Sequence, residues 1–378
     1  MNTKESMHRW SASLQKMFHA THLYQVEALA AFSFAAARAR HCHLSRLAAH
    51  VPLEAQPASE LRRLHRFLGN SRLDVQAVCA QMAQWLGAWN RPTCRLTVLL
   101  DETPHSNQWR VIKVSVCYRR RALALAWRVD PLTQRSQVQS VHQVLGQAAD
   151  LVQQYAPQAQ VVLLADRGLC WPSIMHFCRQ NQWHFVLRAQ SSTLFRYFDS
   201  TSTSTSSSPE SSPERKTPLK QLVTQSRQWF KGEGIAFQKA GWLPVNVVGC
   251  WRPGSQEPWF LVTDLRPSLH LMRTYAHRMW HEQSFRDEKS HGFCWDQSRI
   301  KTAARMDRLL LILALAQLWL SWLGCCATDP HLPWRQTMGL HSHRARRRAS
   351  LFRTGWTFLL KCLDWGILPP CQLKFVPS

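Results

Sequence analysis

The sequence predicts an α/β protein in which a mixed sheet is flanked by helices, with an N-terminal helical domain and an inserted β-rich subdomain. Residues 1–90 carry long segments rich in Ala, Leu, Gln and Arg, without strand-like alternation. Two short apolar runs, Leu96–Asp101 and Val161–Asp166, each end in an acid, as central strands covered on both faces do. Gly234–Asp264 sets tryptophans among valine and leucine, which favours further strands.

The first 90 residues are expected to form several helices. Turn signals at Pro52–Pro57 and at Gly69-Asn70 separate them. Between these turns, Leu61–Leu68 places leucines on one helical face and arginines mostly on the other. We therefore predict an amphipathic helix with a basic exterior, for which an ordinary soluble face is an equally good explanation.

From Arg95 the pattern changes to strands. We expect, in order, strands at Leu96–Asp101, Trp109–Tyr118 and Ala122–Val129, a helix at Val138–Tyr155, a strand at Val161–Asp166 and a helix at 172–181. The run Ser200–Pro213 has too little apolar surface to offset the entropy of ordering. It is predicted to be a mobile surface loop that precedes the β-rich segment.

Charge points to a polyanion as the partner. The 378 residues hold 47 Lys and Arg against 23 Asp and Glu, a net charge of +24 and a pI near 10.3. This excess goes beyond what solubility requires, and it includes clusters at Arg119–Arg121 and Arg344–Arg348. Nucleic acid is the expected partner, since no basic amphipathic membrane anchor is evident.

Cysteine usage and apolar segments favour a cytoplasmic protein. Twelve cysteines show no CxxC pairing, which predicts reduced core thiols. His41-Cys42-His43 and His291-x-x-Cys294 lack a second ligand pair at finger-like spacing, so structural zinc is disfavoured. The apolar run Leu309–Ala327 is near the lower length limit for a bilayer span, and we interpret it as a buried core helix. No signal peptide is expected, because Met1–Lys16 lacks an apolar core region.

The most informative stretch is Tyr275–Lys289. On a continuous helix, at roughly 100° per residue, Tyr275, Arg278, Arg286 and Lys289 fall within about 40° of Glu282, whereas Asp287 and Glu288 point elsewhere. One carboxylate thus lies in a stripe of phosphate-seeking groups. From this segment alone, a solvated and salt-bridged helix is the alternative.

The spacing Y-x(2)-R-x(3)-E-x(6)-K in this stretch resembles the signature helix of bacterial insertion-sequence transposases, family four among the DDE enzymes. This resemblance implies an RNase H-like fold with two metal-binding aspartates upstream of Glu282, each at the end of a buried strand. Asp101 and Asp166 are the candidates. It also implies that Tyr275, Arg278, Arg286 and Lys289 bind DNA, and that the N-terminal helical region recognises the transposon end.

The resemblance implies a metal-dependent mechanism. Transfer of a phosphodiester needs an oxygen nucleophile and neutralisation of charge, which two Mg²⁺ ions supply, with Mn²⁺ as an alternative. Hard cations of this kind prefer carboxylate oxygens, and Asp101, Asp166 and Glu282 would provide them. The partners would be double-stranded DNA, as transposon ends and target, and a second copy of the chain in a homodimer that brings two ends together. The location would be cytoplasmic and nucleoid-associated.

Five segments follow from these patterns. We predict a helical DNA-end-binding domain at 1–90, the first part of the catalytic core at 91–190, the β-rich insertion with its flexible loop at 191–266, the second part of the core at 267–327, and a basic helical region at 328–378. The tail includes Ala349–Gly355, which also resembles the family.

Two other functions remain open at this point. An RNase H-like DNA nuclease without strand transfer would share the three acids. A catalytically decayed DNA-binding relic of a transposable element would keep the acids without turnover.

Overall fold

A computed structural model describes residues 2–105, 108–133, 137–197, 216–289, 292–329, 331–332 and 350–377. The predicted Ser200–Pro213 loop, the basic run Arg344–Arg348 and His291 of the suggested zinc pattern lie outside these residues. The chain divides into two compact units, which are described separately. The first comprises Met1–Cys94, Glu102–Ala159 and Trp280–Ser378, and the second comprises Arg95–Asp101 and Gln160–Met279.

The first unit is built on helices. They are α1 (Asn2–Met17), α2 (Leu23–Ala39), α3 (Leu44–Ala49), α4 (Pro57–Gly69), α5 (Val75–Met82), α6 (Val138–Tyr155), α9 (Met279–Glu288), α10 (Ala303–Thr328) and α12 (Leu351–Asp364), with short 3₁₀ turns at Ala83–Trp89 and Trp295–Gln297. Proline opens α4 at its first turn, and α4 buries Leu64 and Leu68 while Arg62 and Arg66 stay exposed. The predicted amphipathic helix is therefore confirmed.

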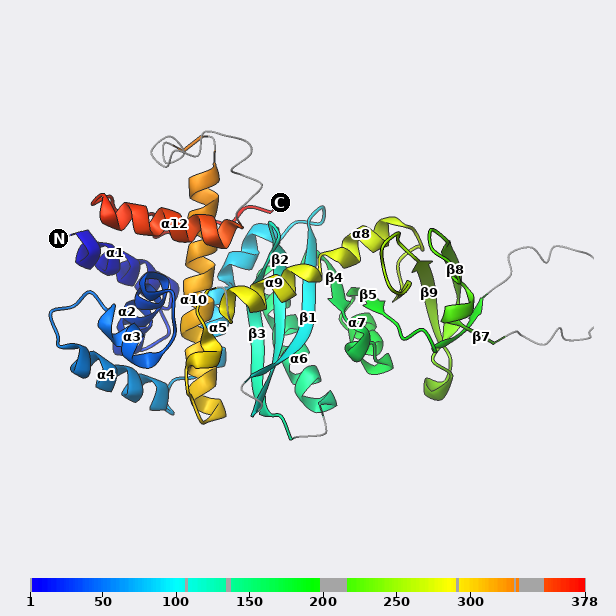
Figure 1. The fold of residues 1–378 in the computed structure, drawn as a ribbon, viewed down its shortest axis with the longest axis horizontal. Helices are drawn as coiled ribbons and strands as arrows, with labels where there is room; N and C mark the ends of the chain where they lie inside the picture. Colours follow the sequence, from blue (N-terminus) through cyan, green and yellow to red (C-terminus); the bar gives the residue numbers. More distant parts are fainter. Residues whose placement is uncertain are drawn as a thin grey trace, which may run out of the picture. The chain divides into compact units, whose positions relative to one another are not determined.

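Helix α10 is the core of the first unit (Figure 1). By length and composition α10 could cross a membrane, but 94% of its most apolar 18-residue stretch is buried inside the protein. The helix packs against α2, α4, α12 and strand β3. Trp319 stacks on Trp10 of α1 with ring centroids 4.5 Å apart. Where α10 crosses α12, Gly324 and Gly355 allow close backbone approach, because a Cβ at either position would collide with a main-chain carbonyl. The interpretation of Leu309–Ala327 as a buried core helix is confirmed.

The strands form one mixed sheet of ten, in the order β3-β2-β1-β4-β5-β10-β9-β8-β6-β7. This confirms the predicted fold class of a mixed sheet flanked by helices. The strands are β1 (Arg95–His105), β2 (Trp109–Tyr118), β3 (Arg121–Pro131), β4 (Gln160–Ala165), β5 (His184–Arg188), β6 (Leu194–Tyr197), β7 (Thr217–Pro218), β8 (Trp229–Ala236), β9 (Leu243–Cys250) and β10 (Trp259–Thr263). In the first unit, β2 and β3 form an antiparallel hairpin on which α6 packs.

In the second unit, the beginning of β1 pairs in parallel with β4, and β4 pairs in parallel with β5. Helix α7 (Pro172–Gln180) packs on β5, and α8 (His270–Ala276) contacts β5 and β9. Strand β10 pairs antiparallel with β5, and β9, β8, β6 and β7 follow. The strands after Gln190 thus extend the sheet that carries β4, and do not form a separate one.

Candidate active site

Asp101 and Asp166 occupy equivalent positions on two neighbouring parallel strands. The register pairs Leu99 with Leu164 and Leu100 with Ala165, so that each aspartate is the next residue after the last pair. Residues in register on parallel strands point to the same face, and adjacent strands lie about 4.8 Å apart. The two aspartates therefore follow the last register pair of β1 and β4 in the second unit, and main-chain hydrogen bonds set the spacing of the two strands there.

Asp101 is held by an arginine. Its Oδ2 lies 3.1 Å from Nη1 of Arg278, and the residue is 7% exposed. The prediction that Asp101 ends its strand is wrong, because β1 continues to His105. Thr103 and His105 of this extension are buried although they are polar, so the apolar run alone could not reveal it.

Asp166 ends its strand as predicted. β4 finishes at Ala165, and Asp166 caps a short 3₁₀ turn, where its Oδ1 accepts a hydrogen bond from Leu169 N at 3.1 Å. Beyond it, Arg167 and Arg188 both reach the carboxylate of Glu257, at 3.2 and 2.6 Å. This end of the sheet therefore carries both carboxylates and cations.

Tyr275 is buried in the second unit, within electrostatic reach of both aspartates. It is 2% exposed, and its ring meets the edge of Trp259 with centroids 5.4 Å apart. Burial raises the pKa of its phenol well above the usual value, the charges of Asp166 and Asp101 add to this, and Arg278 and Arg188 oppose it. The phenol therefore stays protonated and keeps an O–H group that can donate a hydrogen bond.

The predicted continuous helix from Tyr275 to Lys289 is wrong. α8 ends at Ala276, two residues form a turn, and α9 begins at Met279. In this turn His277 N and Arg278 N bond to the carbonyls three residues back, at 3.1 and 2.9 Å. The angles calculated for one straight helix therefore do not relate Tyr275 and Arg278 to Glu282.

Glu282 lies in the first turn of α9, in the first unit, and is half-buried. The inner face of α9 is polar, and contacts with β2 and β3 hold it. His281 Nε2 lies 3.2 Å from Ser115 Oγ, and Ser284 Oγ accepts a hydrogen bond from Ala122 N at 2.9 Å. The register of β2 and β3 shifts between Val114 and Ser115, next to this contact, and leaves Leu125 of β3 as the extra residue of a β-bulge.

Two buried ion pairs complete the contacts of α9 with β2 and β3, which we call the polar seam. Lys113 Nζ donates to both oxygens of Glu288 at 2.6 Å, and both side chains are 4% exposed. Arg121 Nε lies 2.8 Å from Asp287 Oδ2, in an ion pair without linear hydrogen-bond geometry. Asp287 and Glu288 are thus structural anchors of α9, which leaves Glu282 as the acid on its other side.

Lys289 and Arg286 differ in their surroundings. Lys289 Nζ donates to Thr103 Oγ1 at 2.6 Å and to the Pro104 carbonyl at 2.9 Å, so it is attached to the end of β1 in the first unit. Burial lowers the pKa of its ammonium group. Arg286 is exposed on the outer face of α9.

Sequence reasoning missed the residues that support the site. Lys113 and Arg121 are separated by more than 160 positions from the acids that they bind, and nothing local marks them. Arg188 and Arg252 flank Trp259, with guanidinium carbons 5.5 and 5.2 Å from its ring centroid. The short apolar run Phe185–Leu187, which ends in a basic residue, was the signal that could have identified Arg188.

The donor set suits a hard divalent cation. Asp101 and Asp166 offer carboxylate oxygens side by side, and an arginine balances the charge of Asp101. Among the described residues, no three His, Cys, Asp or Glu side chains are grouped so that they could hold a metal.

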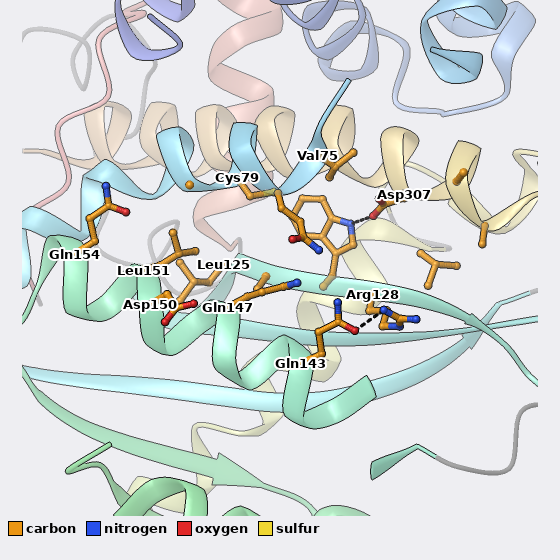
Figure 2. A pocket seen from close by; sticks show the side chains of 17 residues that line it. Val75, Cys79, Leu125, Arg128, Gln143, Gln147, Asp150, Leu151, Gln154 and Asp307 are labelled. Carbon is orange, nitrogen blue, oxygen red and sulfur yellow. Dashed lines mark hydrogen bonds between the residues drawn. The ribbon is translucent and has the colours of Figure 1, made fainter. Parts of the chain in front are cut away.

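A separate cavity of about 430 Å³ lies in the first unit, between α5, α6, β3 and α10 (Figure 2). Asp307 reaches into it and accepts a hydrogen bond from Trp127 Nε1 at 2.7 Å. Burial raises the pKa of this carboxyl to about 6. It contains none of the predicted site residues.

Comparison with known proteins agrees with this geometry. No curated protein matches the chain. A family model described as transposase DDE domain matches residues 95–319, which is more than half of the 378 residues and includes Asp101, Asp166 and the whole Tyr275–Lys289 segment. The chain therefore belongs to the family of transposases with a DDE domain.

Proposed function

We propose that this DDE transposase cuts and rejoins DNA at the ends of an insertion sequence, by phosphodiester hydrolysis followed by strand transfer. The observation that carries the proposal is the register of β1 and β4, which aligns Asp101 with Asp166 on adjacent parallel strands. We further propose that the segment Tyr275–Lys289 is the signature of insertion-sequence family four, with Glu282 as the third acid.

In this mechanism Asp101, Asp166 and Glu282 would hold two divalent cations, Mg²⁺ or Mn²⁺. These ions, when bound, supply charge neutralisation for the attacking and leaving oxygens. The contribution of the protein would be to hold the carboxylates in position, which Arg278 supports by its ion pair with Asp101.

Four side chains would position the DNA strand. Arg278 and Lys289 are proposed to contact phosphates beside the scissile bond, and Arg286, exposed on α9, a further one. The protonated phenol of Tyr275 would donate a hydrogen bond to the same strand. We further propose that the chain forms a homodimer that pairs two transposon ends. Its proposed location is cytoplasmic and nucleoid-associated.

The test uses the purified full chain with Mg²⁺, a duplex carrying the end of its own element, and a target plasmid. We expect Asp101→Asn, Asp166→Asn and Glu282→Gln each to lower cleavage at least about a thousandfold, or about 4 kcal/mol of transition-state stabilisation, with end binding largely intact. Asp150→Asn and Glu233→Gln, at exposed carboxyls, are matched controls that should cleave normally.

Each outcome separates the functions. Cleavage with joined products supports transposition. Cleavage by the wild-type chain without joined products would indicate a nuclease without strand transfer instead. Binding without cleavage in Mg²⁺ or Mn²⁺ indicates a relic. Substantial cleavage by Glu282→Gln removes Glu282 from the site.

A further inference from the structure

The turn between β2 and β3 has an unfavourable sequence for its conformation. Tyr118 pairs directly with Arg121, so the loop consists of Arg119 and Arg120 alone. Both have positive φ, 41° and 69°, as a type I′ hairpin turn requires. Asn-Gly is the preferred sequence for this turn, because side chains with a Cβ are disfavoured there.

The turn is fastened to α9. Arg121 Nη1 donates to the carbonyl of Arg120 at 2.7 Å and to Oε1 of Gln283 at 2.6 Å. The same guanidinium forms the buried ion pair with Asp287. A single buried arginine thus joins the turn to the residue that follows Glu282 in the chain.

Exposed arginines lie on the elements around Arg121, which connects the β2–β3 turn to α9. Arg119 and Arg120 at the turn, Arg286 on α9 and Arg353 on α12 are all exposed. Arg286 follows Gln283 by about one helical turn, so the two share a face. The charge of Arg353 opposes that of Arg121, whose pKa is lowered first by burial and also by Arg353. We call these four residues the arginine surface.

The acid between these arginines does not reach solvent. Asp287 is 4% exposed and engaged by Arg121, and burial raises its pKa, with Arg121 and Arg353 opposing that rise. The surface therefore presents cations with planar donor groups that match phosphate oxygens.

We propose that the arginine surface binds the backbone of DNA, so that Arg119, Arg120 and Arg353 add contacts to the one proposed for Arg286 of the signature segment. Residues in disfavoured backbone regions persist where a function requires them, and here the two strained positions both carry guanidinium groups. Arg119 is steadied by the Tyr118 ring, 5.5 Å from its guanidinium carbon, while Arg120 extends from the tip. The inference rests on the proposed function for the identity of its partner, DNA.

The experiment compares two matched glycine variants of the full chain. Arg120 and Arg227 are both exposed with nearly equal positive φ, 69° and 70°, so Arg120→Gly and Arg227→Gly remove the same charge from positions that both favour glycine. Binding to a linear duplex of arbitrary sequence is measured across a range of salt concentrations. Thermal unfolding of each variant is recorded in parallel.

We expect Arg120→Gly to weaken binding several-fold and to make the slope of log K against log salt shallower by about 0.9, the value for one phosphate contact. The double variant Arg119→Asn/Arg120→Gly should make this slope shallower by about 1.8, the value for two phosphate contacts. It should unfold at the same or a higher temperature than wild type, because the turn then has its preferred sequence. Arg227→Gly should leave the slope unchanged. An unchanged slope in Arg120→Gly, or an equal change in Arg227→Gly, overturns the inference.

Failure here is distinguishable from failure of the proposed function. If the wild-type chain cleaves and Glu282→Gln does not, while Arg120→Gly binds like wild type, only the arginine surface is lost. If Arg120→Gly shows the expected slope and the wild-type chain never cleaves, DNA binding by the arginine surface is supported and the proposed function is contradicted.

Discussion

The aspartates on the sheet and the glutamate on α9 are held in place in different ways. Asp101 and Asp166 follow buried apolar strands whose main-chain hydrogen bonds fix their register. Glu282 belongs to a helix whose inner face is attached to β2 and β3 by side chains, chiefly the Lys113–Glu288 and Arg121–Asp287 ion pairs.

The difference concerns how easily each acid can be displaced. Backbone register is shared over six consecutive residue pairs of β1 and β4, so a single side-chain change leaves it in place. A polar seam depends on a few directional contacts between buried charges, and the loss of one partner leaves the other uncompensated. The strand acids should therefore tolerate core substitutions that the helix acid would not.

The largest effect is expected from breaking the seam. Lys113→Met leaves Glu288 buried without its cation and should lower the free energy of unfolding by about 3–5 kcal/mol. Urea denaturation measures the loss, and cleavage per folded molecule should also fall because α9 is no longer held. Lys113→Met/Glu288→Leu removes both charges and should recover most of the stability. A single variant as stable as wild type would contradict the structural role of this pair.

A core substitution in β1 tests the other side of the comparison. Leu100 is fully buried, and Leu100→Ala should cost about 2–5 kcal/mol of unfolding free energy through lost burial and a cavity. Because the main chain sets the position of Asp101, cleavage per folded molecule should stay within a few-fold of wild type. A loss of cleavage as large as that of Asp101→Asn would show that side-chain packing positions this acid too.

A smaller effect is expected at Asp307, a half-buried carboxyl whose pKa is raised mainly by burial. Its pKa is raised from 3.8 to about 6, so the folded state binds this proton more tightly than the unfolded state does. The stability that the bound proton contributes is fully present below pH 3.8 and is lost as pH rises through 6. Asp307→Asn, which can still accept from Trp127, should stabilise the protein at about pH 7.5 by up to about 3 kcal/mol, and by less at about pH 5. Urea titrations at the two pH values measure this, with Asp150→Asn as an exposed control in the same cavity. Equal stabilisation at both pH values would contradict the assignment.

The smallest effect concerns Lys289, which is bonded to β1. Lys289→Ala should weaken DNA binding and make its salt slope shallower by about 0.9, since one phosphate contact is lost. Thr103→Val removes the hydroxyl that Lys289 binds and should cost about 1 kcal/mol of stability without changing the slope. If both variants left the slope as in wild type, Lys289 would be only an anchor between α9 and β1.

Local sequence patterns predicted the elements well where the periodicity is strong. The bounds of β2 and α6 agree with Trp109–Tyr118 and Val138–Tyr155, and β4 ends directly before Asp166. The extension of β1 through Thr103 was missed because distant residues bury its polar side chains: Lys289 donates to Thr103, and the ring of His105 packs edge-on against Trp295. The break between α8 and α9 was missed because neither proline nor glycine marks it.

The sequence by itself determined the order of strands and helices, the excess of positive charge and the three candidate acids, because apolar periodicity and residue type are local properties. Only the tertiary structure decided which charges neutralise one another: Arg278 with Asp101, Lys113 with Glu288 and Arg121 with Asp287. Each of these pairs joins residues more than 160 positions apart, and an ion pair requires contact within a few ångströms that only the folded chain provides.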